Sequence, residues 1–183
     1  TIHPSAVDIH TSLPGRTNAF EIAQVRPQVT GVIEKRLFVE GSDITVGQQL
    51  YQVDASRYKA TFESAQGQLE QAQARAVTAS AKARRYRDLV RAHAVSSQDY
   101  DDAVAAEKEA LGQVLTARGQ VASAQVDLGY TKMYAPITGR IGRTLTTVGA
   151  LVTANQTQNL AVITRLDPIY VDVNLPAITL LRL

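Results

Sequence analysis

The sequence predicts an elongated, multidomain α+β fold in which an antiparallel α-helical coiled-coil hairpin is inserted into a small β domain. A central stretch between Pro27 and Pro136 lacks proline and carries small apolar residues at coiled-coil spacing. Two short β-type segments that flank this stretch repeat one another, and strand-like segments occupy both ends of the 183-residue chain. We therefore expect a nested arrangement: an outer β module, an inner β domain and a helical rod.

The two ends of the chain are expected to form the outer β module. Residues 1–24 contain Pro4, Pro14 and Gly15 around short alternating stretches, a pattern that is typical of one or two strands with turns. Residues 165–183 supply a return strand. Two strand regions do not make a stable independent sheet, so we expect this module to be incomplete. Because the chain opens on Thr1 rather than methionine, we expect it to be a mature or trimmed piece of a longer protein.

Residues 25–54 and 131–164 are expected to form the two halves of the inner β domain, because they repeat one another. Val29-Thr30-Gly31 in the first half matches Ile137-Thr138-Gly139 in the second. Further along, Gly41 matches Gly149, and residues 50–53 match residues 160–163 after a two-residue insertion. The sequence thus predicts a β domain with internal two-fold symmetry, interrupted by the helical stretch.

The glycines of this repeat do not indicate a nucleotide-binding loop. Gly139-Arg140-Ile141-Gly142 leads into strand-like residues rather than into a helix, so it fits neither a dinucleotide loop nor a P-loop. We interpret Gly31 and Gly139 as parts of tight β turns.

Residues 55–130 are expected to form the hairpin, with Asp54 and Ser56 as candidate N-caps and a turn near residues 93–97. The seam positions of the outgoing leg are all apolar: Phe62, Ala65, Leu69, Ala72, Ala76, Ala79, Ala83, Tyr86 and Val90. The returning leg repeats the pattern with one polar exception, Glu107: Ala103, Glu107, Ala110, Val114, Ala117, Val121, Ala124 and Leu128. A seam made mostly of alanine stabilises a rod only weakly, so we expect neighbouring chains to pack along its sides.

Charged clusters lie near the predicted turn. Lys82, Arg84, Arg85, Arg87 and Arg91 close the first helix, while Asp99, Asp101 and Asp102 open the second. Both placements favour the helix dipoles, and the hairpin brings the two clusters near each other, where ion pairs across the hairpin would help to set its register. With a net charge of only +2, the chain is not expected to bind nucleic acid.

Composition excludes several chemistries. The chain has no cysteine, which removes disulfides, thiol catalysis and cysteine-based metal sites. Its three histidines, His3, His10 and His93, lie far apart without metal-ligand spacing, and the three aspartates lack the glycine and glutamate of a calcium loop. We therefore expect no catalytic, cofactor-binding or metal site. No apolar run approaches the length that spans a bilayer.

Longer stretches carry a family resemblance. The inner repeat is similar to the biotinyl/lipoyl carrier fold, but the helical insertion takes the place of the hairpin that presents the modified lysine, and Lys59 falls within the helix. A lipoyl-like β domain split by a coiled-coil hairpin and flanked by β-barrel strands resembles the periplasmic adaptors, or membrane fusion proteins, of RND multidrug efflux pumps (the AcrA/MexA group). The resembling stretches are LPGRTNAFEIAQVRPQVTGVI from Leu13, RYRDLVRAHAVSSQDYDDA from Arg85, LGYTKMYAPITGRIGRTLTTVGALV from Leu128 and LDPIYVDV from Leu166.

The resemblance implies a non-enzymatic function and a set of tip contacts. In this family an arginine, a leucine four residues later and a serine or threonine seven residues after that engage the outer-membrane channel; here they fall on Arg85, Leu89 and Ser96. On the competing structural interpretation, Arg85 pairs with acids of the second helix, Leu89 packs locally, and Ser96 or Ser97 caps that helix.

The resemblance also implies partners and a location. The partners are an inner-membrane RND transporter, a TolC-type outer-membrane channel and further copies of the chain, six in the family. The location is the periplasm, with the full-length protein attached to the inner membrane. The alternatives are an adaptor for an ABC or major-facilitator exporter, a lipoyl or biotin carrier, and a coiled-coil scaffold without a role in transport.

Overall fold

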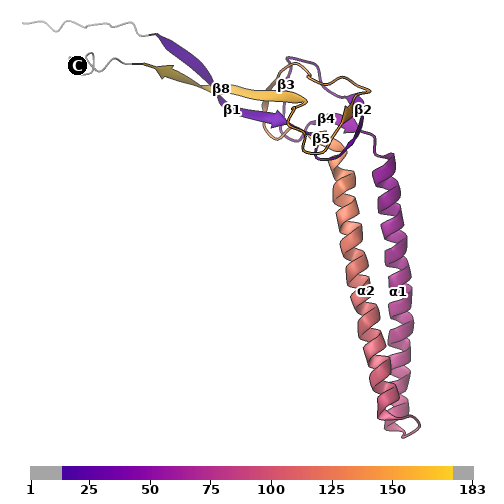
Figure 1. Ribbon diagram of the computed structural model, residues 1–183. Helices are drawn as coiled ribbons and strands as arrows, with labels where there is room; N and C mark the ends of the chain where they lie inside the picture. The colour runs from indigo at the N-terminus through magenta and orange to yellow at the C-terminus, as the bar shows by residue number, and fades with distance from the viewer. Residues whose placement is uncertain (1–13, 175–183) are drawn as a thin grey trace, which may run out of the picture.

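The computed structural model describes residues 14–174 and confirms the predicted fold class (Figure 1). Two long helices, α1 (Ser56–Arg91) and α2 (Ser97–Tyr130), lie side by side and extend from one side of a β domain. The predicted strand regions within residues 1–13 and 175–183 lie outside the described residues. The strands are β1 (Gly15–Val25), β2 (Gly31–Arg36), β3 (Asp43–Ile44), β4 (Gln49–Val53), β5 (Lys132–Tyr134), β6 (Gly139–Ile141), β7 (Leu151–Val152) and β8 (Ala161–Val173).

The β domain consists of two four-stranded antiparallel sheets that enclose one core. The strand orders are β1-β8-β6-β3 and β5-β4-β2-β7, so each sheet combines strands from both halves of the repeat. Apolar side chains from both sheets are fully buried in the core: Ile33, Leu50, Tyr51, Val53, Ile141, Val152, Leu160 and Ile163. Neither half can form this core without the other.

Reciprocal hydrogen bonds confirm the predicted internal repeat. The N–H of Gly41 donates to the carbonyl of Ile141 at 2.9 Å, and the N–H of the matching Gly149 donates to the carbonyl of Ile33 at 2.8 Å. Both glycines have positive φ angles, 74° and 88°, which a residue with a Cβ adopts at a cost. The glycines matched in the sequence therefore occupy equivalent turns in the two halves of the repeat.

The threonines of the repeated motif join the two halves in the same way. The hydroxyl of Thr138 accepts the N–H of Val46 in the first half, and the hydroxyl of Thr30 accepts the N–H of Ala154 in the second, both at 3.0 Å. Each threonine thus satisfies a backbone donor of the other half, a donor that would otherwise have to find water or remain unpaired.

The interpretation of Gly31 and Gly139 as turn residues was wrong. They begin strands β2 and β6, and neither has a positive φ. What they provide is close approach between strands: a Cβ at Gly139 would lie 2.6 Å from the carbonyl oxygen of Thr164, and one at Gly31 would lie 2.6 Å from a methyl group of Val53. Packing rather than turn geometry requires glycine at these positions.

The two extensions of the β domain leave it at equivalent places. Strand β4 pairs with β5 at Tyr51 and Met133, next to the bases of α1 and α2. The matching pair is β8 with β1, at Ala161 and Val25, from which the long β1–β8 ribbon begins. The helical hairpin and the ribbon are therefore attached at the corresponding corners of the two halves and point in different directions (Figure 1).

The hairpin follows the predicted seam. Every predicted seam residue of both helices is buried or half-buried, including Glu107. At the middle of the rod the seam residues form a small apolar cluster of Leu69, Ala72, Ala76, Ala79, Ala110, Val114 and Ala117. The turn spans residues 92–96, and His93 adopts a left-handed conformation with a φ of 56°.

The hairpin base is tied to the β domain by hydrogen bonds. The predicted N-caps require a correction, because Ala55 occupies the cap position of α1 without a side-chain bond. Instead, a carboxylate oxygen of Asp54 accepts the N–H of Ser56 at 2.9 Å, and this bond lowers the pKa of Asp54. Tyr58, in the first turn of α1, donates its hydroxyl to the carbonyl of Thr30 at 2.8 Å.

We predict opposite effects for two glycine-to-alanine substitutions. Gly139→Ala should lower the free energy of unfolding by about 1–3 kcal/mol, because the new methyl group meets strand backbone that must shift. Gly67→Ala, in α1 and facing open space, should raise it by up to about 1 kcal/mol. Urea unfolding followed by circular dichroism measures both, and equal effects of the two substitutions would contradict the packing role of Gly139.

Candidate interaction surface at the hairpin tip

The two sides of the hairpin differ in chemistry. On one side, shallow hollows follow one another along the line where α1 and α2 meet. We call this the groove side; its residues are Arg57, Thr61, Ser64, Gln68, Gln71, Arg75, Thr78 and Lys82 of α1, and Ala106, Glu109, Gln113, Thr116, Gln120, Ser123 and Asp127 of α2. Most are polar, so the groove does not have the apolar lining of a typical small-molecule pocket.

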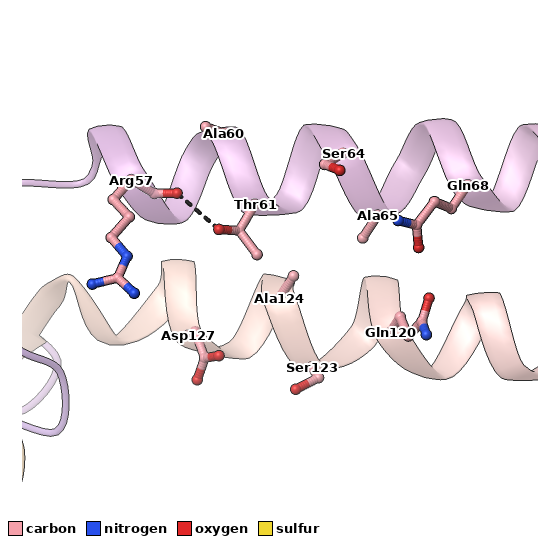
Figure 2. A pocket seen from close by; sticks show the side chains of 10 residues that line it. All are labelled: Arg57, Ala60, Thr61, Ser64, Ala65, Gln68, Gln120, Ser123, Ala124 and Asp127. Carbon is pink, nitrogen blue, oxygen red and sulfur yellow. Dashed lines mark hydrogen bonds between the residues drawn. The ribbon is translucent and has the colours of Figure 1, made fainter.

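Figure 2 shows the part of the groove nearest the β domain. Ala65 and Ala124 lie at the seam, with polar side chains such as Gln68 and Gln120 around them. The hydroxyl of Thr61 donates to the carbonyl of Arg57, at 3.0 Å, within the same helix. This hollow is open and polar, and its side chains form no catalytic constellation.

Arg85 and Leu89 continue the groove side to the end of the rod. Arg85 lies seven residues beyond Thr78, and Leu89 lies seven residues beyond Lys82, so both keep the helical face of those residues. Both side chains are exposed, Leu89 to 41%. Since they are four residues apart, they are neighbours on the helix surface.

The structure contradicts two parts of the competing interpretation, in which Arg85 pairs with acids of α2 and Leu89 packs within the hairpin. Among residues 14–174, the ion pairs are Arg36–Glu40, Lys59–Glu63 and Arg165–Glu21, so no ion pair joins the arginines of α1 to the aspartates of α2. The prediction that such pairs help to set the register was therefore wrong. Leu89 is exposed and therefore does not pack within the hairpin.

The third part of that interpretation holds, because Ser96 caps α2. Its hydroxyl accepts the N–H of Asp99 at 3.1 Å and donates to the Asp99 carboxylate at 2.6 Å. That carboxylate also accepts the N–H of Ser96 at 3.2 Å, which completes a capping box. The hydrogen bonds from the side chain and the backbone of Ser96, with a smaller contribution from the charge of Lys82, lower the pKa of Asp99.

Sequence reasoning missed the role of Asp99. It placed the residue among acids that favour the helix dipole, although the pattern Ser96-x-x-Asp99 just after a turn is itself the sequence signal of a capping box. On the other helix, Lys82 lies over the Tyr86 ring, 5.4 Å from its centroid. The tip thus places Arg85 and Leu89 just before the turn and the Ser96–Asp99 cap just after it.

This arrangement is suited to contact with a protein rather than to catalysis. Arg85 can donate several hydrogen bonds to carbonyl or carboxylate groups, Leu89 offers an apolar anchor, and the Ser96 oxygen keeps a free lone pair. Among the described residues, no three His, Asp or Glu side chains come together in a way that could hold a metal ion. Within residues 14–174, neither helix is both long and apolar enough to cross a bilayer.

A two-fold β domain that carries a long helical hairpin defines the membrane fusion class of proteins. The family described as "RND MFP, barrel-sandwich hybrid domain" matches residues 21–164. The chain therefore belongs to the RND membrane fusion protein family, and the predicted resemblance is confirmed.

Individual relatives agree with this assignment. The chain is 46% identical over 186 residues to the multidrug export protein AcrE of Escherichia coli, covering all of this chain and 48% of AcrE. It is 50% identical over 183 residues to the multidrug resistance protein MexA of Pseudomonas aeruginosa, covering all of this chain and 44% of MexA. The chain thus spans about half the length of these relatives.

A solved structure supports the fold. It is that of a MacA–MexA chimeric protein containing the MexA α-hairpin domain of Pseudomonas aeruginosa. Its TM-score is 0.58 at 32% identity, over 82% of this chain and 50% of the chimera.

We predict that the capping box stabilises the hairpin tip and that low pH weakens it. Ser96→Ala should destabilise the tip by about 1 kcal/mol, whereas Ser96→Thr should retain most of the cap. The pKa of Asp99 is lowered by folding, so its contribution is present above the ordinary value of 3.8 and is lost as the pH falls through the lowered value. Amide hydrogen exchange in residues 92–100 measures both effects.

The matched control is Asp99→Asn, which cannot titrate. The protection of the tip amides in this variant should depend less on pH, as the pH falls below the ordinary value of 3.8, than in the parent chain. If the two chains lose protection in parallel, Asp99 does not carry the acid sensitivity of the tip.

Proposed function

We propose that the protein is a non-enzymatic periplasmic adaptor of a tripartite multidrug efflux pump. It links an inner-membrane RND transporter to an outer-membrane channel of the TolC type. The observation that carries the proposal is the exposed pair Arg85 and Leu89 at the far end of the hairpin. With 36 residues in α1, the rod reaches about 50 Å from the β domain, farther than any loop of a compact domain.

Each module has a part in this proposal. Residues 55–130 form the rod that reaches the channel, and residues 25–54 and 131–164 form the two halves of the β domain that holds the rod. The described parts of the end segments 1–24 and 165–183, residues 14–24 and 165–174, supply strands to a β-barrel. Two relatives are named for multidrug export and multidrug resistance, and a solvent efflux relative from Pseudomonas putida is named a periplasmic linker.

At the tip, Arg85, Leu89 and Ser96 contact the channel. The guanidinium of Arg85 donates to carbonyl or carboxylate groups at the ends of channel helices, and Leu89 packs into an apolar gap between them. Ser96 shapes the turn through its bonds with Asp99 and presents its remaining lone pair. By binding the open channel more tightly than the closed one, the adaptor shifts the channel toward the open state.

The adaptor acts as a homo-oligomer, with six copies around a central conduit. The mostly alanine seam and the glycines within the helices leave the single rod weakly stabilised, and neighbouring copies supply the missing packing. The assembly lies in the periplasm, with the full-length protein attached to the inner membrane. The proposal requires no cofactor and no nucleic acid.

Substitution of the tip residues tests the proposal. Arg85→Glu and Leu89→Asp, each in the full-length protein, should lower the drug concentration that the cells withstand to that of a strain lacking the adaptor. The matched controls are Arg75→Glu and Val126→Asp, which make the same changes of charge on the rod away from the tip, at exposed positions. The controls should retain most of the resistance.

Drug susceptibility is read together with the amount of adaptor in the periplasm, so that poor folding is not mistaken for lost contact. Resistance retained by both tip variants at normal protein levels would contradict the docking role of the tip. Loss of resistance in the Arg75 and Val126 controls as well would show that the whole rod, rather than its end, is required.

A further inference from the structure

Tyr58 is the side chain through which the helical hairpin contacts the core of the β domain. It lies in the first turn of α1, and its half-buried ring packs against the apolar core of that domain. Its hydroxyl donates to the carbonyl of Thr30 at 2.8 Å. Among the described residues that form this core or pack on it, Tyr58 is the only one that belongs to either helix. The contact therefore joins the rod directly to the domain that holds it.

Thr30 connects this contact to both halves of the β domain. While its carbonyl accepts the hydrogen bond of Tyr58, its hydroxyl accepts the N–H of Ala154, in the second half, at 3.0 Å. The next residue, Gly31, lies so close to Val53 that a Cβ at this position would be 2.6 Å from a methyl group of the valine. The acceptor of the Tyr58 hydrogen bond is thus held in place by its surroundings.

The backbone supplies the other attachment of the hairpin. The N–H of Val53 donates to the carbonyl of Thr131 at 2.8 Å. Thr131, which connects α2 to β5, is fully buried. The N–H of Asp54 donates to the carbonyl of Val32 at 2.9 Å, and α1 begins just beyond it, at Ser56. These bonds fix where the helices start, but an attachment at this one level leaves the rod free to tilt about it.

The length of the rod makes its angle important. With 36 residues in α1, the tip lies about 50 Å from the β domain. A tilt of about 6° at the base displaces the tip by about 5 Å on this length. That displacement exceeds the reach of a hydrogen bond or of an apolar contact. Arg85 and Leu89 can therefore meet fixed partners only if the angle at the base is controlled.

The internal repeat offers a comparison within the same molecule. Thr138 matches Thr30, but it lies at the corner from which the β1–β8 ribbon leaves the domain. Counted from the ends of the matched segments, the residue in the place of Tyr58 is Pro168, which has no hydrogen-bond donor. Among residues 14–174, no side chain donates to the carbonyl of Thr138, and an open hollow lies between Thr138 and Thr164. The Tyr58 contact thus belongs to the hairpin rather than to the repeat.

We propose that Tyr58 is a positioning residue, which fixes the angle of the hairpin on the β domain and thereby places the tip for docking. The backbone bonds at residues 53 and 54 hold the base, and the Tyr58 contact prevents the rod from tilting about it. This inference rests on the docking of the tip proposed above and adds the residue that controls where the tip lies. Tyr58 acts through the rod and does not itself touch the channel.

Distances between spin labels test the angle. In the purified full-length protein, labels are attached at Val39→Cys, an exposed position of the β domain, and at Gln98→Cys, an exposed position beside the turn. Dilution with unlabelled protein restricts the measurement to distances within one copy, and double electron–electron resonance gives their distribution. Tyr58→Phe, which keeps the ring but loses the hydrogen bond, should widen the distribution about 1.5-fold, and Tyr58→Ala about twofold or more.

Two controls make the result specific. Tyr86→Phe makes the same substitution on the same helix, near the tip and away from the β domain, and should leave the distribution unchanged. Labels at Arg118→Cys and Gln98→Cys both lie on α2, so their distance should stay the same in every variant. Equal widening by Tyr86→Phe, or widening between the two labels on α2, would show a loss of rod structure and would overturn the proposal. A distribution as narrow in Tyr58→Ala as in the parent chain would do so too.

Drug susceptibility links the angle to docking. At normal amounts of periplasmic protein, Tyr58→Ala should lower the drug concentration that the cells withstand about fourfold, because fewer rods hold the angle that docking needs. Tyr86→Phe should leave it unchanged. If Arg85→Glu abolishes resistance but Tyr58→Ala does not lower it, the docking role stands and the positioning role fails. If Arg85→Glu retains resistance, the docking role fails, and the spin-label distances alone decide whether Tyr58 fixes the angle.

Discussion

The hydrogen-bonded clamp between the two halves of the β domain is the interaction on which the rest of the structure depends. Gly41 and Ile141 in one direction, and Gly149 and Ile33 in the other, join halves that are separated in the sequence by the whole hairpin. The clamp brings β4 and β5 together and so fixes the distance between the bases of α1 and α2. At the equivalent corner of the other half, the pairing of β1 with β8 begins the β1–β8 ribbon.

The rod inherits its direction from this base because its own seam is weak. Alanine side chains let the helices approach closely but bury little apolar area. At one end, the Asp54 carboxylate accepts a hydrogen bond and the Tyr58 hydroxyl donates one; at the other end lies the Ser96–Asp99 capping box. These interactions therefore matter more than they would in a leucine-rich coiled coil. Apolar residues such as Val77 and Leu115 face outward from this weak seam.

Sequence reasoning recovered the periodic and repeated features, because these follow from spacing alone. The seam, the hairpin turn and the match of Gly41 with Gly149 belong to this group. Sequence reasoning failed for features that depend on contacts between segments far apart in the chain. The need for glycine at position 139 comes from the backbone of Thr164, and no local pattern distinguishes that need from a turn. The expected ion pairs across the hairpin failed because the arginines and aspartates point away from the seam.

The candidate tip residues could be named from the family resemblance, but their exposure and the cap around Ser96 required coordinates. The central claim is that the end of this rod touches an outer-membrane channel. The most direct measurement places a photo-crosslinking amino acid at position 89 of the full-length protein in cells, with position 126 near the base as the comparison. The account predicts a channel adduct from position 89 and none from position 126. An adduct only with other copies of the adaptor, or equal channel adducts from both positions, would contradict it.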